Sequence, residues 1–71
     1  MAILVGIIGG GVFEFGPEHD DERLRWEIGK HGQLAIIKQV HNAGMGRTGW
    51  TDEAVIRVFN GRVWSDIEIV E

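Results

Sequence analysis

Apolar and polar residues alternate along much of this chain with a period of two, which is typical of β-strands with one buried face. The clearest stretch is residues 22–28, where Leu24, Trp26 and Ile28 alternate with charged residues and are therefore predicted to point inward. Gly, Asn or Asp residues separate such runs and favour turns. The pattern predicts an all-β fold, either a five- or six-stranded, strongly bent antiparallel sheet or a small open barrel.

The sequence around Asn60 and Gly61 predicts a β-hairpin. This dipeptide is favoured in two-residue type I′ turns, because both turn positions need a positive φ angle. It lies between two apolar runs, and pairing outward from it sorts the side chains into one apolar and one mixed face. The predicted opposite pairs on the buried face are Val58 with Val63, Ile56 with Ser65 and Ala54 with Ile67.

A second hairpin is predicted at residues 30–32, and the N-terminal run has two interpretations. Gly32 supplies the left-handed residue of a three-residue loop that also contains Lys30 and His31. The predicted opposite pairs are Ile28 with Leu34 and Trp26 with Ile36. Residues 2–8 and 12–15 are expected to form two short strands joined by the glycines between them, or one strand interrupted by a bulge.

A competing interpretation of residues 51–60 is a short helix, which would make the fold α+β. Thr51 would act as its N-cap, and Asn60 with Gly61 as its C-cap. β-Branched residues weaken such a helix. If the helix formed, the separation of the hairpin side chains into one apolar and one mixed face would be a coincidence. Both interpretations stay open at this point, and Ile56 separates them because only the hairpin buries it.

Size and composition limit the classes of protein to which this chain can belong. Its 71 residues are expected to form one domain, residues 1–71, with no Cys and hence no disulfide or zinc-binding cysteine pair. The net charge of −4 repels phosphate backbones and anionic membranes, so neither nucleic acid nor a membrane is an expected partner. The apolar stretch at residues 1–8 is far shorter than the roughly 20 residues that span a bilayer. We expect a cytoplasmic protein.

Two glycine-rich segments invite comparison with phosphate-binding loops. Residues 44–49 match the dinucleotide-binding pattern GxGxxG, but Trp50 occupies a position where the helix of that motif should already run. The segment Val5-Gly6-Ile7-Ile8-Gly9-Gly10-Gly11 resembles the opening strand and phosphate loop of nucleoside phosphorylases and of some dinucleotide-binding enzymes. The resemblance covers these seven residues and no amphipathic helix follows, so no family residue is assigned and no cofactor is expected.

The candidates for metal binding and catalysis carry no diagnostic spacing. His19 lies among four carboxylates in residues 18–22, a charge run whose simplest role is a solvated connection. An arrangement of His41, Thr48 and Asp52 can be drawn, but the spacing does not require it. We therefore predict no catalytic residue and no metal site.

The Trp residues are expected to play different roles, because large aromatic side chains both fill small cores and dominate binding sites. Trp26 alternates with apolar residues and is predicted to be core. Trp64 shares the second face of the hairpin with Arg57, where a cation–π contact is expected. Trp50 ends the Gly-rich loop at residues 42–52 and has no predicted core role. The predicted binding residues are His41, Arg47, Trp50, Arg57 and Trp64.

Several predicted strands are apolar on both faces, of which one small core can cover only one. They are residues 3–5, 34–37 and 54–56. Exposure of the second faces would exceed the apolar area that monomers usually tolerate, so we expect a homo-oligomer, a dimer or larger. The predicted function is a non-catalytic, self-associating module that binds a protein or small ligand through the loop at 42–52 or the Arg57/Trp64 face. The alternative is a small enzyme or an anion-binding protein whose site lies between subunits.

Overall fold

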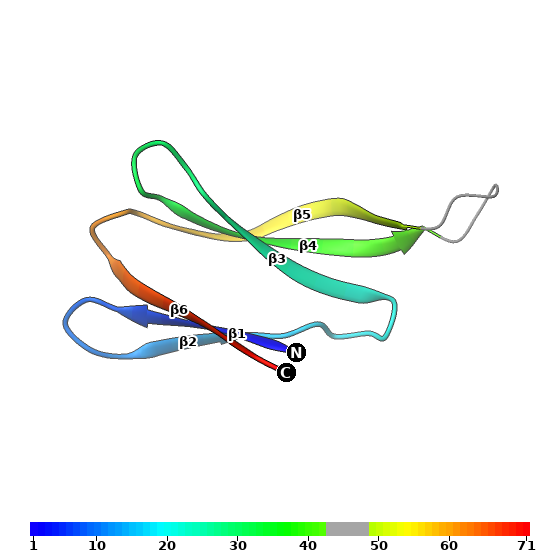
Figure 1. Cartoon of the computed structure of the whole chain (residues 1–71), viewed down its shortest axis with the longest axis horizontal. Coiled ribbons are helices and arrows are strands. Elements are labelled where there is room, and N and C mark those ends of the chain that lie inside the picture. The colour runs from blue at the N-terminus through cyan, green and yellow to red at the C-terminus, as the bar shows by residue number, and fades with distance from the viewer. Residues whose placement is uncertain (43–48) are drawn as a thin grey trace.

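A computed structural model describes residues 1–42 and 49–71 of the chain, in which it shows six β-strands (Figure 1). Their bounds are β1 Ala2–Ile7, β2 Val12–Phe15, β3 Glu22–Ile28, β4 Leu34–Asn42, β5 Gly49–Phe59 and β6 Trp64–Val70. The all-β prediction is confirmed, and the alternative helix at residues 51–60 is wrong because β5 occupies this segment. The described residues form no helix, and hence none that is long and apolar enough to cross a membrane.

The strands form two three-stranded antiparallel sheets. The strand order is β2-β1-β6 in one sheet and β3-β4-β5 in the other. β6 runs beside β1, with Val70 opposite Ala2, so the two ends of the chain lie together (Figure 1). The molecule is flat, with principal extents of 46 × 25 × 15 Å. Its smallest extent suits two sheets packed about 10 Å apart.

The hairpin predicted at residues 30–32 is confirmed, and the N-terminal run forms two strands joined by a turn, the first of its two interpretations. β3 pairs with β4 in the predicted register, which sets Ile28 opposite Leu34 and Trp26 opposite Ile36. The N–H of Gly29 donates to the carbonyl of Gln33 over 2.8 Å, and Gly32 has a φ of 79°. A residue with a Cβ rarely adopts that conformation, so glycine is needed at this point of the turn. β1 pairs with β2 across the glycine-rich turn at residues 8–11.

The predicted hairpin about Asn60 and Gly61 is wrong, because the strands that flank this turn lie in different sheets. β5 pairs with β4, whereas β6 pairs with β1. Gly61 has no positive φ, so the type I′ turn does not form. Instead, the N–H of Val63 donates to the carbonyl of Asn60 over 2.9 Å, and the N–H of Arg62 donates to the Asn60 side chain over 3.0 Å. This turn passes the chain from one sheet to the other.

The core lies between the two sheets. Its buried apolar residues are Ile3 and Val5 from β1, Leu24 from β3, Leu34 and Ile36 from β4, and Phe59 from β5. Full burial of one such side chain stabilises the fold by about 1.5–3 kcal/mol, so these few residues hold the sheets together. Trp26, predicted to be core, is instead 42% exposed because β3 is an edge strand. Ile56 and Ser65, predicted on the buried face of the hairpin, are also exposed.

The space between the sheets is closed at one side by aromatic rings and an arginine. Phe13 of β2 packs against Phe59 of β5 with ring centroids 5.4 Å apart, and the Arg57 guanidinium lies 4.9 Å from the centre of the Phe13 ring. Elsewhere, β6 is tied to the β3–β4 turn, since the indole N–H of Trp64 donates to the carbonyl of Gly32 over 2.8 Å. No described strand covers the free edge of β3.

Candidate binding surface

The β3–β4–β5 sheet has an outer face that points away from the core. Opposite residues in antiparallel strands share a face, so the register defines this surface row by row. Its rows are Glu27 with Ala35 and Val58, Arg25 with Ile37 and Val55, Arg23 with Gln39 and Asp52, and His41 with Trp50. We call these residues the outer face; along β4 they alternate with the core residues Leu34 and Ile36. The outer face is apolar toward one end and polar toward the other.

A hydrogen-bonded network of four side chains crosses the polar half of the outer face. Nε of Arg23 donates to Oε1 of Gln39 over 2.8 Å, and Nε2 of Gln39 donates to Oδ1 of Asp52 over 2.8 Å. Arg25 donates to both oxygens of the same carboxylate, over 2.8 and 2.6 Å. A bidentate contact between arginine and carboxylate fixes the orientation of the two side chains as well as their distance. The network therefore holds its side chains in one arrangement before any partner binds.

These contacts stabilise the charged forms of Asp52 and Arg25. The hydrogen bonds from Arg25 and then from Gln39 lower the pKa of Asp52 from 3.8 to about 2. The hydrogen bond to Asp52 in turn raises the pKa of the Arg25 guanidinium. Arg25 and Asp52 neutralise each other at neutral pH, whereas Arg23 forms no ion pair with a carboxylate of the described residues.

Trp50 lies beside this network, at the end of the face where the β4–β5 pairing stops. The guanidinium carbon of Arg23 lies 4.5 Å from the centre of the indole ring, which is a cation–π contact. The ring of His41 meets the indole edge-on, with centroids 5.2 Å apart. Trp50 is half-buried, while Arg23 and His41 are exposed. The surface thus presents to solvent a cation that is fixed on an aromatic ring.

The structure brings together some of the predicted binding residues and separates others. His41 and Trp50 are in contact. Arg47 lies outside the described residues. Arg57 packs over phenylalanine rings, and Trp64 donates to the β3–β4 turn. The predicted contact between Arg57 and Trp64 required the hairpin that does not form, so the shared Arg57/Trp64 face is corrected to two separate positions.

Arg23 belongs to this surface but was absent from the predicted binding residues. Its outward position follows from the alternation along β3, which was the available signal. Its contact with Trp50 depends on two successive strand pairings, β3 with β4 and β4 with β5. The sequence predicted the first pairing and not the second.

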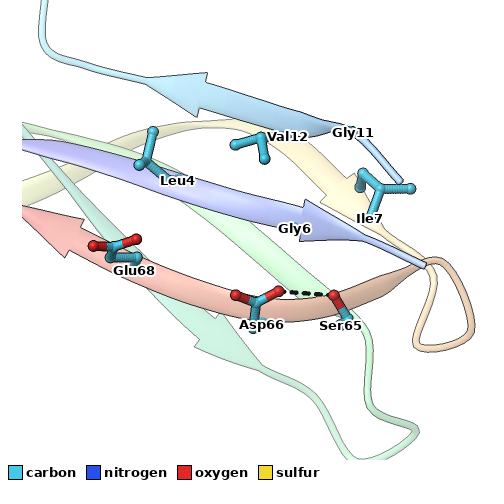
Figure 2. A pocket seen from close by; sticks show the side chains of 8 residues that line it. All are labelled: Leu4, Gly6, Ile7, Gly11, Val12, Ser65, Asp66 and Glu68. Atoms are coloured by element: carbon cyan, nitrogen blue, oxygen red, sulfur yellow. Dashed lines mark hydrogen bonds between the residues drawn. The ribbon is translucent and has the colours of Figure 1, made fainter. Parts of the chain in front are cut away.

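A second feature is an open hollow of about 230 Å³ on the β2–β1–β6 sheet (Figure 2). It is lined by Leu4, Gly6, Ile7, Gly11, Val12, Ser65, Asp66 and Glu68. The Ser65 hydroxyl donates to the Asp66 carboxylate over 2.7 Å. This carboxylate packs so closely over Gly6 that a Cβ at residue 6 would collide with it. The lining holds carboxylates and a hydroxyl but no imidazole, ammonium or guanidinium group. It therefore has no cationic side chain to stabilise a developing negative charge.

The other segments considered for chemistry have different outcomes. Residues 5–11 run through a turn into β2 and not into a helix, so the likeness to phosphate loops ends at the sequence. The GxGxxG pattern at residues 44–49 lies almost wholly outside the described residues. Within residues 1–42 and 49–71, no group of three His, Cys, Asp or Glu side chains could hold a metal ion. No family model, curated protein or solved structure matches the chain.

Proposed function

We propose that this protein is a non-catalytic, self-associating module that binds an acidic segment of a partner protein through the Trp50 end of its outer face. The observation that carries the proposal is the Arg23 guanidinium, which lies 4.5 Å from the centre of the Trp50 ring and donates to Gln39. Trp and Arg are the residue types that most often dominate the binding energy of protein interfaces.

Arg23 supplies the recognition chemistry of this surface. Its Nε donates to Gln39, while its terminal Nη groups donate to no described residue. A guanidinium presents its N–H groups as a rigid fork that matches the two oxygens of a carboxylate. Because the contacts with Trp50 and Gln39 already fix the side chain, binding costs little rotamer entropy.

The apolar half of the outer face offers a partner segment further contact. Val55 and Val58 of β5 are 58% and 56% exposed. Both lie on the same face as Trp50 but toward its other end, so a segment that binds at Trp50 and extends along β5 would contact them. Aromatic residues and arginine are enriched in protein–protein interfaces. This open face suits a protein segment better than a small molecule, which binds in an enclosed cavity.

Selection of peptides from a random display library on the immobilised protein tests this function. We expect enrichment of peptides that carry Asp or Glu next to apolar residues. Replacement of the acidic residue by its amide should weaken binding by about tenfold or more, since a charge-assisted hydrogen bond is lost. Trp50→Ala and Arg23→Gln should each weaken binding of the same peptides by a similar factor, with an unchanged far-UV circular dichroism spectrum.

Lys30→Gln is the matched control, because it removes one positive charge from the exposed β3–β4 turn, away from Trp50. Peptide affinity should be unchanged in this variant. Selected peptides without acidic residues, or equal affinity of the Trp50→Ala variant, would contradict the proposed function.

A further inference from the structure

Of the four edge strands in the two sheets, β3 is the one best suited to pair with another strand. All seven of its residues pair with β4 in one unbroken register. β5, at the opposite edge, carries two bulges, since Ile56 and Glu53 have no opposite residue in β4. Bulges and very short strands are devices that discourage edge pairing, and β2 has four residues. In β6, antiparallel pairing about Ile67 would set Asp66 against Glu68, two like charges.

The side chains of β3 that point toward the core side are left partly uncovered at this edge. Leu24 is buried, but Trp26 and Ile28, which share its face, are 42% and 49% exposed. Their neighbours across the β3–β4 pairing, Ile36 and Leu34, are fully buried. An added strand with apolar residues on the same face would therefore extend the core rather than create a separate contact.

A second copy of β3 satisfies this requirement in one antiparallel register. Pairing about Trp26 sets Leu24 opposite Ile28 of the other copy on the core side, and Arg25 opposite Glu27 of the other copy on the outer side. Two-fold symmetry repeats each of these pairs, so apolar residues meet apolar residues and opposite charges meet twice. Pairing about Arg25 or about Glu27 would instead set identical charges against each other at the two-fold axis.

We propose that two copies of this chain form a symmetric dimer through antiparallel β3–β3 pairing centred on Trp26. The two β3–β4–β5 sheets become one continuous sheet, in which the exposed Trp26 is covered by Trp26 of the other copy and the exposed Ile28 by Leu24 of the other copy. This inference rests on the self-association in the proposed function and names its partner and interface. Trp50, on β5, stays at the far edge of the sheet and remains free to bind.

Charge variants test the register by sedimentation equilibrium at micromolar concentration. The wild-type chain should have twice its monomer mass of 7.9 kDa. Glu27→Arg collects four guanidinium groups at the interface and should weaken dimerisation by about tenfold or more, because like charges opposite each other destabilise strand pairs. Arg25→Glu should have the same effect, and a mixture of the two variants should restore dimers. Glu68→Arg makes the same charge change on β6 and should leave the mass unchanged.

A cysteine cross-link tests the interface without relying on charge. The chain contains no Cys, and opposite residues of an antiparallel pair have Cα atoms about 4.5–5.5 Å apart, within the range that a disulfide bridges. Under mild oxidation the Trp26→Cys variant should therefore form covalent dimers. The Val58→Cys variant, with its thiol on the bulged β5 strand, should not. Circular dichroism of each variant, including Arg25→Glu, which also loses its contact with Asp52, establishes that it is folded.

A wild-type chain that stays at 7.9 kDa at every concentration would overturn this dimer. So would unchanged dimerisation of Glu27→Arg, or disulfide formation by Val58→Cys as fast as by Trp26→Cys. These outcomes are separate from those for peptide binding. Trp50→Ala should lose peptide affinity and keep the dimer mass, whereas a wild-type chain that stays monomeric and still binds acidic peptides would contradict the dimer alone.

Discussion

Gly61 lies where two turns of the chain approach each other closely. A Cβ on this residue would be 2.7 Å from the carbonyl oxygen of His31 and 2.9 Å from the carbonyl carbon of Gly32. Both atoms belong to the backbone of the β3–β4 turn, which cannot move aside as a flexible side chain would. The need for glycine at residue 61 was visible in the sequence, but its cause is this close approach and not a positive φ.

Gly61→Val should therefore destabilise the fold by about 1–3 kcal/mol, which is the usual cost of forcing extra atoms into a packed site. Urea unfolding followed by circular dichroism measures the change. Gly49→Ala is the control, because nothing lies within 4 Å of a Cβ built there. Equal stability of Gly61→Val and the wild-type chain would mean that the two turns are not in contact.

The Trp residues show what alternation along a strand can and cannot predict. The pattern correctly places Trp26 on the same face as Leu24, but it does not reveal that β3 is an edge strand, so Trp26 is more exposed than expected. Trp64 was assigned to a mixed surface, yet its indole N–H finds the carbonyl of Gly32 and its ring packs against the core. The indole N–H of Trp64 is satisfied by a backbone carbonyl 32 residues away in the sequence, a contact that no periodicity encodes.

At the scale of the elements, local pairings were predictable and distant ones were not. The β3–β4 register follows from a short turn with glycine at the left-handed position, so the sequence fixes which residues face each other. The turn at Asn60 and Gly61 carries an equally strong local signal, but β6 pairs with β1, from the other end of the chain. There Ile67 lies opposite Val5 and Ile69 opposite Ile3, an apolar match that the local hairpin signal does not override.

The contacts of the candidate binding surface likewise include one between residues near in the sequence and one between residues far apart. His41 and Trp50 are nine residues apart in the sequence and were grouped as one contact site on that ground. Arg23 reaches Trp50 only through the complete β3–β4–β5 order. The bulges in β5 add to the difficulty, because each shifts the facing of every residue beyond it by one position.

Ile56 tests the bulged structure of β5 directly. It is 44% exposed and has no opposite residue in β4, so Ile56→Asp should change the free energy of unfolding by less than about 1 kcal/mol, as surface substitutions usually do. The buried Ile36 provides the contrast, since Ile36→Asp places an unpaired carboxylate in the core and should unfold the domain. Denaturant titrations of both variants measure this difference, and loss of folding in Ile56→Asp would support the rejected β5–β6 hairpin.

At the scale of the whole molecule, the apolar second faces predicted from the sequence are only partly exposed. Ile37 lies on the outer face yet is buried, flanked in register by Arg25 and Val55. Long arginine side chains cover apolar neighbours with their methylene groups. Part of the second apolar face is thus covered by side chains of the same chain. The exposed apolar residues that remain in the strands lie on edge strands, which favours the proposed edge-to-edge dimer over a dimer of stacked sheet faces.

The Arg25–Asp52 contact joins β3 to β5 across the sheet, and it makes stability depend on pH in a defined direction. Its hydrogen bonds lower the pKa of Asp52 from 3.8 to about 2. A carboxyl group whose pKa is lowered by folding stabilises the folded state above its unfolded pKa, and this contribution disappears as the pH falls through its folded pKa. The contribution of Asp52 should therefore be complete above about pH 5 and lost by about pH 2.

Asp52→Asn should consequently be less stable than the wild-type chain at neutral pH. The difference in their free energies of unfolding should narrow steadily as the pH falls from about 5 toward 2. Urea midpoints measured through this range at one protein concentration follow this difference in stability. Asp20→Asn removes a carboxylate that forms no ion pair within the described residues and should show no such trend. Only an ionised carboxylate gains from the bidentate contact with Arg25. A stability difference between wild type and Asp52→Asn that stays constant with pH would therefore show that Asp52 stabilises the sheet through contacts that do not need its charge.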